Sequence, residues 1–295
     1  MKKTYGLVEA GGTKFVCAVA SSPEDLREEV RFPTTEPAET LGRVVEYFQA
    51  AQKKWGRLEG LGIGCFGPVD LDKNSPTWGF VTATPKAGWA DTNVAGFLSH
   101  SLELPVVFDT DVNGAALGEH LWGAGAGLDN LVYLTVGTGI GGGVLSGGRL
   151  VHGLVHPELG HFLLSKDPQD TFTGSCPYHG SCAEGLASGP SLEKRWGKKA
   201  QDLPPEHPAW DLEAAYLAQA LLAFMTCFSP QKIILGGGVM EQLQLFPKIH
   251  KEVLRLNNGY IRSPSLTPQG IVNYIVPPSL GNRAGILGAL ALTST

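Results

Sequence analysis

The sequence predicts an α/β protein made of two similar halves with a cleft between them. Strand-like and helix-like stretches alternate through the first third of the chain, and a strand, a glycine-rich turn and a second strand occur in succession near residue 10 and again near residue 140. The length of 295 residues suits two units of about 150 residues each. We therefore expect an N-terminal lobe over residues 1–110, completed by the C-terminal helix 283–295, and a C-terminal lobe over residues 111–282.

The composition is that of a soluble globular protein. Hydrophobic residues make up 43% of the chain and charged residues 17%, with a mean hydropathy of +0.01, which excludes disordered, collagen-like and coiled-coil proteins. The net charge of -5, without a long block of like charges, argues against a nucleic-acid partner. Glu9 interrupts the first apolar stretch too early for a signal peptide or a membrane span. We expect a cytoplasmic protein with no membrane partner.

Local spacing predicts the individual elements. Apolar runs indicate strands, and apolar side chains that recur at helical spacing indicate helices. In the first half we expect strands at 5–8, 15–19, 61–66 and 105–108, and helices at 38–55 and 94–102, the latter capped by Asp91. In the second half we expect strands at 131–136, 144–145, 232–235 and near 271–276, and helices at 211–228 and 284–292. Glycine-bearing turns at 9–14 and 137–143 join the hairpin strands.

The glycine-rich turns are the first chemical signal. Residues 137–142 match the dinucleotide fingerprint GxGxxG, and Glu158 lies near the distance expected of a ribose-binding acid. The match is weak because a helix must begin inside the glycines, whereas residues 143–148 predict another strand and turn. An NAD-dependent oxidoreductase is therefore the weaker interpretation. Two glycine hairpins and the run 236–238 favour backbone N–H groups around nucleotide phosphates; the alternative is that the glycines only make tight hairpins.

Several motifs in order carry a resemblance to a known family. Residues 9–14 (Glu-Ala-Gly-Gly-Thr-Lys), 110–116 (Thr-Asp-Val-Asn-Gly-Ala-Ala) and 136–143 (Val-Gly-Thr-Gly-Ile-Gly-Gly-Gly) resemble the signatures of ROK-family sugar kinases, and the resemblance continues through 156–161, 176–185 and 236–239. It implies an actin-like, hexokinase-like ATPase fold with two lobes and a cleft between the lobes. It also implies ATP with Mg²⁺, a hexose substrate and a homodimer. The opening motif and the run from Cys176 to Pro190 look most like the zinc-containing bacterial fructokinases, which implies conversion of D-fructose to fructose 6-phosphate.

Asp111 is the candidate general base. Phosphoryl transfer needs positioning, a metal that neutralises phosphate charge, and a carboxylate that takes the proton from the attacking hydroxyl. Asp111 follows a predicted strand and precedes the helix-like stretch 114–122, so it should face the cleft. The alternative is that Asp111 only caps this helix. Asp109 could cap the helix in the same way and serves as the control. We expect Asp109→Asn to lower turnover much less than Asp111→Asn.

Three positions depart from the family pattern. Glu9 stands where most members carry Asp, whose carboxylate helps to hold the metal or its waters, so the reach of the side chain changes and its charge does not. Phe66 replaces a usual proline, and we assign no functional consequence to it. Thr110 replaces an Asn that is common before the catalytic Asp, which weakens the transfer of a sugar contact to this position.

The remaining ligand contacts divide between ATP and the sugar. Thr13 and Thr138, with their glycine loops, should hold the phosphates, and the resemblance implies adenine and ribose near Pro190 and residues 236–240. The ATP-binding candidates are Glu9, Gly11, Gly12, Thr13, Lys14, Thr138, Gly139, Pro190, Gly236, Gly237, Gly238, Val239 and Met240. The carboxylates of Glu158 and Glu184 can accept hydrogen bonds from sugar hydroxyls, and the resemblance adds Asn113 and His161 as sugar contacts.

A second cluster has the spacing of a metal site. Cys176-x2-His179-x2-Cys182 supplies three ligands within seven residues, and tetrahedral zinc needs a fourth. The spacing alone permits His152, His156 or His161, and the resemblance implies His161. Four protein ligands leave no open position, so the zinc should be structural and should hold Glu158 and Glu184 in place. The alternatives are a Cys176–Cys182 disulfide, which the cytosol disfavours, and unrelated surface residues. Cys17, Cys65 and Cys227 lie in apolar runs and should be core thiols.

Two rival functions remain open. A kinase of the same family acting on glucose, mannose or an N-acetyl sugar could use the same carboxylates. A sugar-sensing repressor on this fold would need a DNA-binding domain before the first phosphate loop, and only eight residues precede Glu9, so we expect an enzyme.

Overall fold

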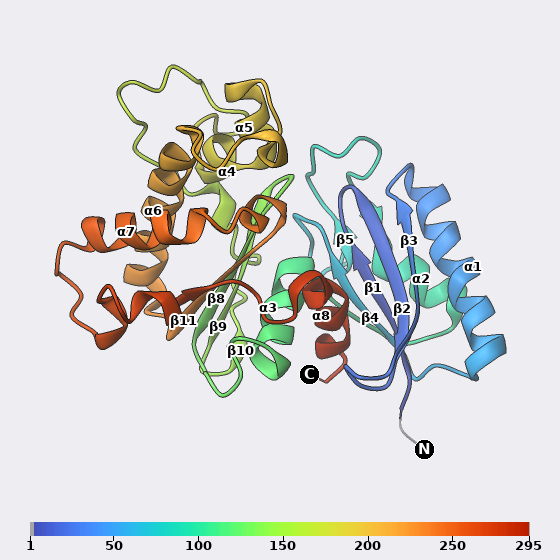
Figure 1. Ribbon diagram of the computed structural model, residues 1–295. Coiled ribbons are helices and arrows are strands. Elements are labelled where there is room, and N and C mark those ends of the chain that lie inside the picture. The colour runs from blue at the N-terminus through green and yellow to red at the C-terminus, as the bar shows by residue number, and fades with distance from the viewer. Residues whose placement is uncertain (1–2, 295) are drawn as a thin grey trace. The chain divides into compact units, whose positions relative to one another are not determined.

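Two five-stranded sheets with the same plan organise the chain, of which the computed structural model describes residues 3–294 (Figure 1). The strand orders are β3-β2-β1-β4-β7 and β10-β9-β8-β11-β12. In each sheet the opening strand pairs antiparallel with the next strand and parallel with a later one.

The strands of the first sheet are β1 (Tyr5–Ala10), β2 (Lys14–Ala20), β3 (Leu26–Pro33), β4 (Leu61–Cys65) and β7 (Val106–Thr110). Those of the second are β8 (Leu131–Val136), β9 (Ile140–Ser146), β10 (Arg149–Leu150), β11 (Lys232–Gly236) and β12 (Ile275–Val276), and β5 (Phe80–Val81) pairs with β6 (Thr92–Asn93). The repeat confirms the predicted α/β fold of two similar halves.

The sheets belong to two compact units. Unit 1 contains the chain up to Ala126, the segment Leu150–His156 and the segment from Asn282 onward, and unit 2 contains Gly127–Arg149 and Pro157–Gly281. The boundary lies beyond the predicted position at residue 110 because α3 (Asp111–Trp122) packs against α8 (Ala284–Leu292) within unit 1.

Helices cover both faces of the unit 1 sheet (Figure 1). α1 (Pro37–Trp55) and α2 (Val94–Leu102) lie on one face, and α3 and α8 lie on the other. The central strands β1 and β4 therefore bury nearly every side chain, as strands covered on both faces do. Phe15, Phe48 and Trp89 are fully buried in the resulting core.

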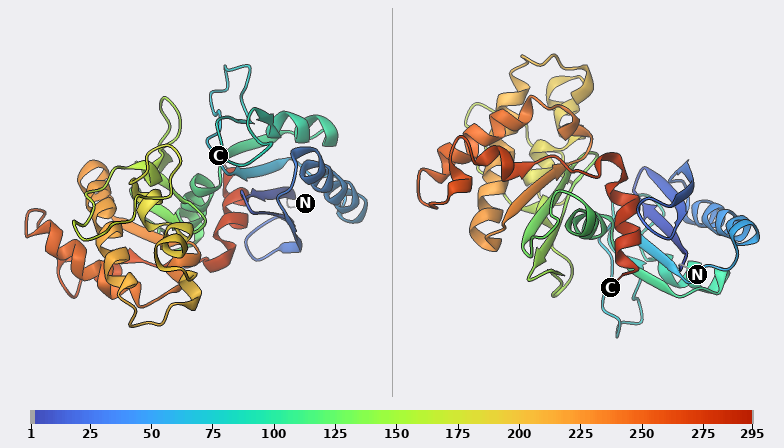
Figure 2. Two further views of the ribbon diagram at one scale, coloured as in Figure 1. Left: turned by 90° about the horizontal axis from the view of Figure 1, so that it is seen from above. Right: turned by 60° about the horizontal axis from the view of Figure 1, so that its bottom comes forward.

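Glycine allows α3 and α8 to approach each other closely. A Cβ on Gly288 would lie 2.3 Å from the carbonyl carbon of Gly114. Both views in Figure 2 keep α8, in red, beside α3, in green. α8 buries almost all of its side chains against α3, β1 and β4, so the last helix of the chain is part of the core that its first strand begins.

In unit 2 two long helices pack against each other, and two short ones follow the long loop after β10. The long helices are α6 (Ala209–Phe228) and α7 (Leu245–Asn257), and the short ones are α4 (Ala183–Ala187) and α5 (Gly189–Trp196). By length and composition α6 could cross a membrane, a test that core helices of soluble proteins also pass, and 50% of its apolar window is buried. Short 3-10 turns lie at Leu159–His161, Ala200–Asp202, Gly238–Glu241, Pro264–Leu266, Ile271–Asn273 and Gly281–Arg283.

The structure differs from the sequence prediction at several places, and it also contains the helices α4, α5 and α7, which were not expected. β3 was not expected, because its charged residues suit an edge strand and interrupt the apolar pattern. Asn93 caps α2 in place of Asp91, since its side chain accepts the N–H of Gly96 at 2.8 Å. The strand expected near 271–276 is a 3-10 turn followed by two residues of β12. Cys227 is exposed, whereas Cys17 and Cys65 are buried as predicted.

Candidate active site

Glu9 and Asp111 lie at the same edge of the unit 1 sheet. Glu9 is near the carboxyl end of β1, and Asp111 begins α3 directly after β7; the register aligns Glu9 with Gly64 of β4, and Gly64 with Asp109 of β7. β1, β4 and β7 are parallel, so their carboxyl ends meet at one edge, where open α/β sheets bind ligands. A Cβ on Gly64 would lie 3.1 Å from the Cα of Asp111, so the bare glycine leaves room for the start of α3.

Burial raises the pKa of both carboxyls. The pKa of Glu9 rises to about 7, first because the group is desolvated and second because of the negative charge of Asp111. Desolvation also raises the pKa of Asp111 to about 6, although the backbone N–H of Val112, which donates to Oδ1 at 2.9 Å, opposes the rise. Two carboxylates at one edge, one raising the pKa of the other, form a set of oxygen ligands that suits Mg²⁺ or its waters.

Thr110, not Asp111, caps α3. The hydroxyl of Thr110 accepts the N–H of Asn113 at 3.0 Å. This cap removes the alternative interpretation of Asp111 as the helix cap and leaves its carboxylate in the first turn, where the helix dipole favours negative charge.

The first glycine hairpin is tightly anchored. Between β1 and β2 the N–H of Gly11 donates to the carbonyl of Lys14 at 3.0 Å, and a Cβ on Gly11 would lie 2.8 Å from that oxygen. Thr34 holds the turn from the other side, because its hydroxyl donates to the carbonyl of Gly11 at 2.6 Å and its N–H donates to the carbonyl of Thr13 at 3.0 Å. Thr13 and Lys14 are exposed, so the turn presents them to a ligand.

The second hairpin is held by Glu184 at the start of α4. Between β8 and β9 the N–H of Gly137 donates to the carbonyl of Gly139 at 2.9 Å, and Thr138 at the tip is exposed. The N–H of Ile140 donates to Oε2 of Glu184 at 3.0 Å, and a Cβ on Gly139 would lie 2.6 Å from the same oxygen. One predicted sugar-binding carboxylate therefore also shapes the predicted phosphate turn.

The glycine run after β11 lies beside this hairpin. Gly237 has a φ of +91°, and a Cβ there would lie 2.4 Å from the carbonyl oxygen of Val136, so this position requires glycine. Gly238 has open space beside it. The side chains of Val239 and Met240 are buried, so they offer a ligand only their backbone. Pro190 lies in the first turn of α5 and is partly buried.

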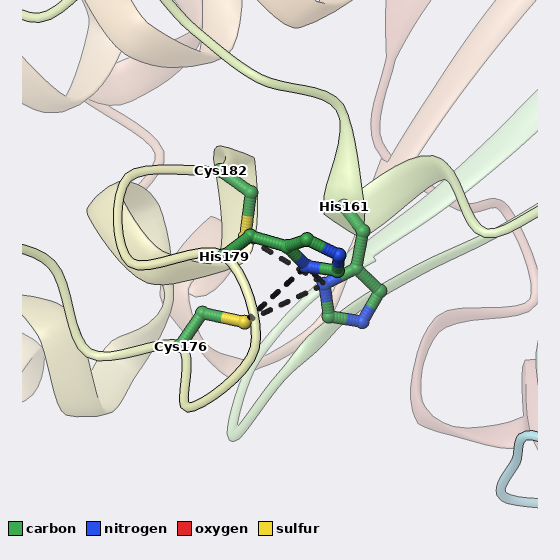
Figure 3. Close-up of side chains that lie close together, drawn as sticks. All are labelled: His161, Cys176, His179 and Cys182. Atoms are coloured by element: carbon green, nitrogen blue, oxygen red, sulfur yellow. Dashed lines mark hydrogen bonds between the residues drawn. The ribbon is translucent and has the colours of Figure 1, made fainter.

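The predicted metal ligands converge in unit 2 (Figure 3). Cys176, His179 and Cys182 come from one loop that leads into α4, and His161 comes from the 3-10 turn at residues 159–161. Nδ1 of His161 lies 3.3 Å from Nδ1 of His179, and 3.7 and 3.6 Å from Sγ of Cys176 and Cys182. All four ligand atoms lie within 4.8 Å of one another.

The distances of 3.3, 3.6 and 3.7 Å from Nδ1 of His161 fit three edges of a zinc tetrahedron. Zinc bonds of about 2.0–2.1 Å to nitrogen and about 2.3 Å to sulfur give N–N and N–S edges of about 3.3 and 3.6 Å. Both cysteines are free thiols, so the structure contains no Cys176–Cys182 disulfide. His152 and His156, which the spacing also permitted, belong to unit 1, where they contact Asp109 and the N–H of Val69.

The sugar-binding candidates differ in exposure. Glu158 is exposed, with Oε2 3.9 Å from Nε2 of His161, the ring nitrogen that faces away from the cysteines. Glu184 is partly buried. Asn113 is completely buried in unit 1, where its amide nitrogen donates to Asp109 at 2.7 Å.

Sequence reasoning missed three residues that shape the unit 1 site. Gly64 and Gly285 act by lacking a side chain, since a Cβ on Gly285 of α8 would lie 2.3 Å from the carboxyl carbon of Glu9. His152 was considered only as a metal ligand. Lone glycines carry no sequence signal of their role, whereas His152, nine residues before the predicted ligand His161, could have been weighed as a partner for Asp109.

The fold and the site residues together define a class of protein. Two similar α/β units with glycine hairpins at equivalent places, and a carboxylate after the last strand of the first sheet, are typical of the sugar kinases of the actin-like, hexokinase-like ATPase fold. The model of the ROK family matches residues 5–295, and the chain belongs to this family.

Relatives and solved structures agree with this membership. A protein of Bacillus subtilis (strain 168) is 50% identical over 97% of this chain and 94% of its own length. A fructokinase of Pediococcus pentosaceus is 43% identical over 97% of this chain and 96% of its own. A ROK family glucokinase from Streptomyces griseus, solved in complex with glucose and AMPPNP, has a TM-score of 0.75 and 26% identity over 97% of each chain. The predicted resemblance is confirmed.

Proposed function

We propose that this protein is an ATP-dependent fructokinase that converts D-fructose to fructose 6-phosphate. The observation that carries the chemistry is Asp111, a carboxylate at the sheet edge with a pKa near 6, beside the second carboxylate of Glu9. The choice of fructose is supported by the 43% identity to a fructokinase over nearly the whole of both chains.

In the proposed reaction Asp111 acts as the general base. The C6 hydroxyl of fructose attacks the γ-phosphorus, the bond from that phosphorus to the bridging oxygen of ADP breaks, and Asp111 takes the hydroxyl proton. Glu9 would help to hold Mg²⁺ directly or through water, while Asp111 accepts the proton, and this ion supplies charge neutralisation at the phosphates. The turns at Gly11–Thr13 and Gly137–Gly139 would direct backbone N–H groups at phosphate oxygens.

Unit 2 supplies further proposed contacts to both substrates. Glu158, Glu184 and His161 would bind sugar hydroxyls. Residues 236–240 and Pro190 would contact the adenosine, with Val239 and Met240 using their backbone. Asn113 is buried, so its contribution to sugar binding would pass through the residues that it holds.

We further propose a structural zinc ion, a homodimer and a cytoplasmic location. The ligand geometry of His161, Cys176, His179 and Cys182 supports the zinc, because four protein ligands complete a tetrahedron and leave no position for a reacting water. The dimer and the location are supported by the family resemblance and by the composition.

A panel of hexoses with Mg²⁺ and ATP tests the substrate. Initial rates should give fructose the highest kcat/KM, by about 10-fold or more, because an aldose places its hydroxyls differently near the anomeric carbon and would leave buried or charged acceptors such as Glu184 without a partner. A higher kcat/KM for glucose, mannose or N-acetylmannosamine would keep the sugar kinase and overturn the fructokinase.

A further inference from the structure

A polar cluster beside Asp111 takes no part in the proton transfer described so far. It consists of Asp109, Asn113 and His152, all in unit 1. Asp109 is 6% exposed and Asn113 is 0% exposed, whereas the side chain of His152 is 41% exposed. A buried carboxylate is costly unless it is fully hydrogen-bonded, so the partners of Asp109 indicate what it does.

Both carboxylate oxygens of Asp109 are engaged. Oδ1 accepts the N–H of Thr110 and the side-chain amide of Asn113, each at 2.7 Å. Oδ2 lies 2.8 Å from Nε2 of His152. The hydroxyl of Thr110 also accepts the backbone N–H of Asn113. These three hydrogen bonds link Asp109, Thr110 and Asn113 in a ring. Asp111 lies on the stretch of backbone that this ring closes, between Thr110 and Asn113.

His152 reaches this ring from a distant part of the sequence. It belongs to the segment Leu150–His156, which returns to unit 1 between two stretches of unit 2. The segment is anchored at its other end, where Nε2 of His156 accepts the N–H of Val69 at 3.2 Å. The hydrogen bond to Asp109 raises the pKa of His152 and so favours the charged imidazolium, which strengthens the pairing.

We propose that Asp109 and His152 form a positioning pair for the phosphoryl transfer. His152 orients the carboxylate of Asp109, the ring through Thr110 and Asn113 fixes the start of α3, and the carboxylate of Asp111 is thereby held in one place. The inference rests on the proposed function for its kinetic test. It also revises the sequence expectation that Asp109 is a simple control: Asp109→Asn should be milder than Asp111→Asn but should still impair turnover.

Kinetics of four variants test the pair. His152→Ala and Asp109→Asn should each lower kcat by about 10- to 100-fold, because small displacements of a catalytic group cost this much, and should change KM for fructose and ATP little. His152→Gln should recover most of kcat, since its amide can donate to Asp109. The double variant should be no slower than the slower single variant, because both changes break one interaction. His100→Gln, at an exposed position on α2, should match the wild type.

Two kinetic results would overturn the positioning role. A rise in KM for fructose with unchanged kcat in His152→Ala would make His152 a direct sugar contact and overturn the positioning role. Unchanged kinetics in both single variants would also overturn it.

A readout without substrate separates this inference from the proposed function. Hydrogen–deuterium exchange at residues 110–113 should be faster in His152→Ala and Asp109→Asn than in the wild type, and His152→Gln should restore the slow exchange. Unchanged exchange in both loss variants overturns the pair even if the enzyme is active. If the wild type phosphorylates no hexose, the proposed function fails, and the exchange measurement still decides whether the pair holds the start of α3.

Discussion

At the scale of single residues, burial at one sheet edge raises the pKa of Asp111 and Glu9, which suits them to catalysis and lowers the stability of the protein when both are ionised. Each carboxyl is desolvated, and the charge of Asp111 further raises the pKa of Glu9. Keeping both ionised therefore costs free energy in the empty protein, and a bound cation would relieve it. This environment suits a base that must hold a proton transiently near neutral pH.

Asp111→Asn should abolish most of the turnover. The amide keeps the shape of the side chain but cannot take a proton, and general-base catalysis contributes about 10²- to 10⁴-fold. The loss should be in kcat, with fructose and ATP binding retained by calorimetry. Asp211→Asn, which changes an exposed carboxylate in the first turn of α6, should have wild-type kcat. A kcat above half the wild-type value in Asp111→Asn would exclude Asp111 as the base.

The same variant should be more stable than the wild type at high pH. The native pKa values of Glu9 and Asp111, about 7 and about 6, exceed their ordinary values of 4.5 and 3.8, so the native state binds more protons and the free energy of unfolding falls as pH rises from about 4 to 7. A shift of about 2 pKa units corresponds to at most about 3 kcal/mol, and partial exposure of Asp111 reduces the expected gain to about 1–2 kcal/mol.

Urea unfolding without Mg²⁺ or ATP measures this effect. Asp111→Asn should match the wild type near pH 4 and exceed its free energy of unfolding at pH 8. Equal stability at pH 8 would contradict the raised pKa of Asp111.

At the scale of elements, the loop of the metal ligands and the second glycine hairpin are mechanically linked. Cys182 caps α4 by accepting the N–H of Gly185, Glu184 in the first turn accepts the N–H of Ile140, and the N–H of Gly189 donates to the carbonyl of Gly137 at 2.8 Å. The start of α4 therefore connects the proposed zinc ion to the proposed phosphate turn.

Variants of Glu184 should separate its two roles. Glu184→Ala removes the acceptor of the Ile140 N–H and should raise KM for ATP by about 10-fold, since a hydrogen bond to a charged group contributes about 1.5–3 kcal/mol. Glu184→Gln keeps a carbonyl acceptor and should spare KM for ATP while raising KM for fructose. Glu158→Gln should raise KM for fructose alone. An equal rise of KM for ATP in Glu184→Ala and Glu184→Gln would disprove the role of Glu184 in holding the second hairpin.

The cysteine loop should carry about one zinc ion per chain. Cys176→Ser should lose the metal and lower the melting temperature, because a tetrahedral zinc ion cross-links the loop to the turn at His161. Cys227→Ser changes an exposed thiol and should keep both zinc content and stability. Elemental analysis of protein purified without chelator decides the matter: full activity with no zinc would refute the site.

At the scale of the whole molecule, the chain closes unit 1 with its own C-terminal helix. α8 packs on α3 through glycines, and Gly285 of the same helix makes room for Glu9. The last helix thus supports the candidate active site as well as the core.

Gly288→Ala should destabilise the protein by about 1–3 kcal/mol, because the added Cβ would meet the backbone of Gly114 and overpack the helix pair. Gly42→Ala on α1 is the matched control: its Cβ meets nothing within 4 Å, so the substitution should be neutral or stabilise the helix by about 0.5–1 kcal/mol. Denaturant unfolding of both variants gives the comparison. A Gly288→Ala protein as stable as Gly42→Ala would mean that the two helices can separate without cost.

Much of the fold and part of the candidate site were predictable from local patterns. The strands around both glycine turns, the helices at 38–55 and 211–228 and the strand before Gly236 follow from apolar spacing, which acts over a few residues. The Cys176-x2-His179-x2-Cys182 spacing likewise brings three ligands together within one loop. These predictions succeeded because the interacting groups are close in the sequence.

The sequence by itself determined the α/β class, the two glycine hairpins, the family and the residue types available for catalysis. Only the tertiary structure decided which residues meet across long separations: His152 with Asp109, Glu184 with Ile140, and Gly288 with Gly114. It also assigned the N-terminal cap of α3 to Thr110 and not to Asp111. The physical reason is that such pairs arise when whole strands and helices pack to bury their apolar faces, and local spacing does not encode which polar groups that packing brings within hydrogen-bond distance.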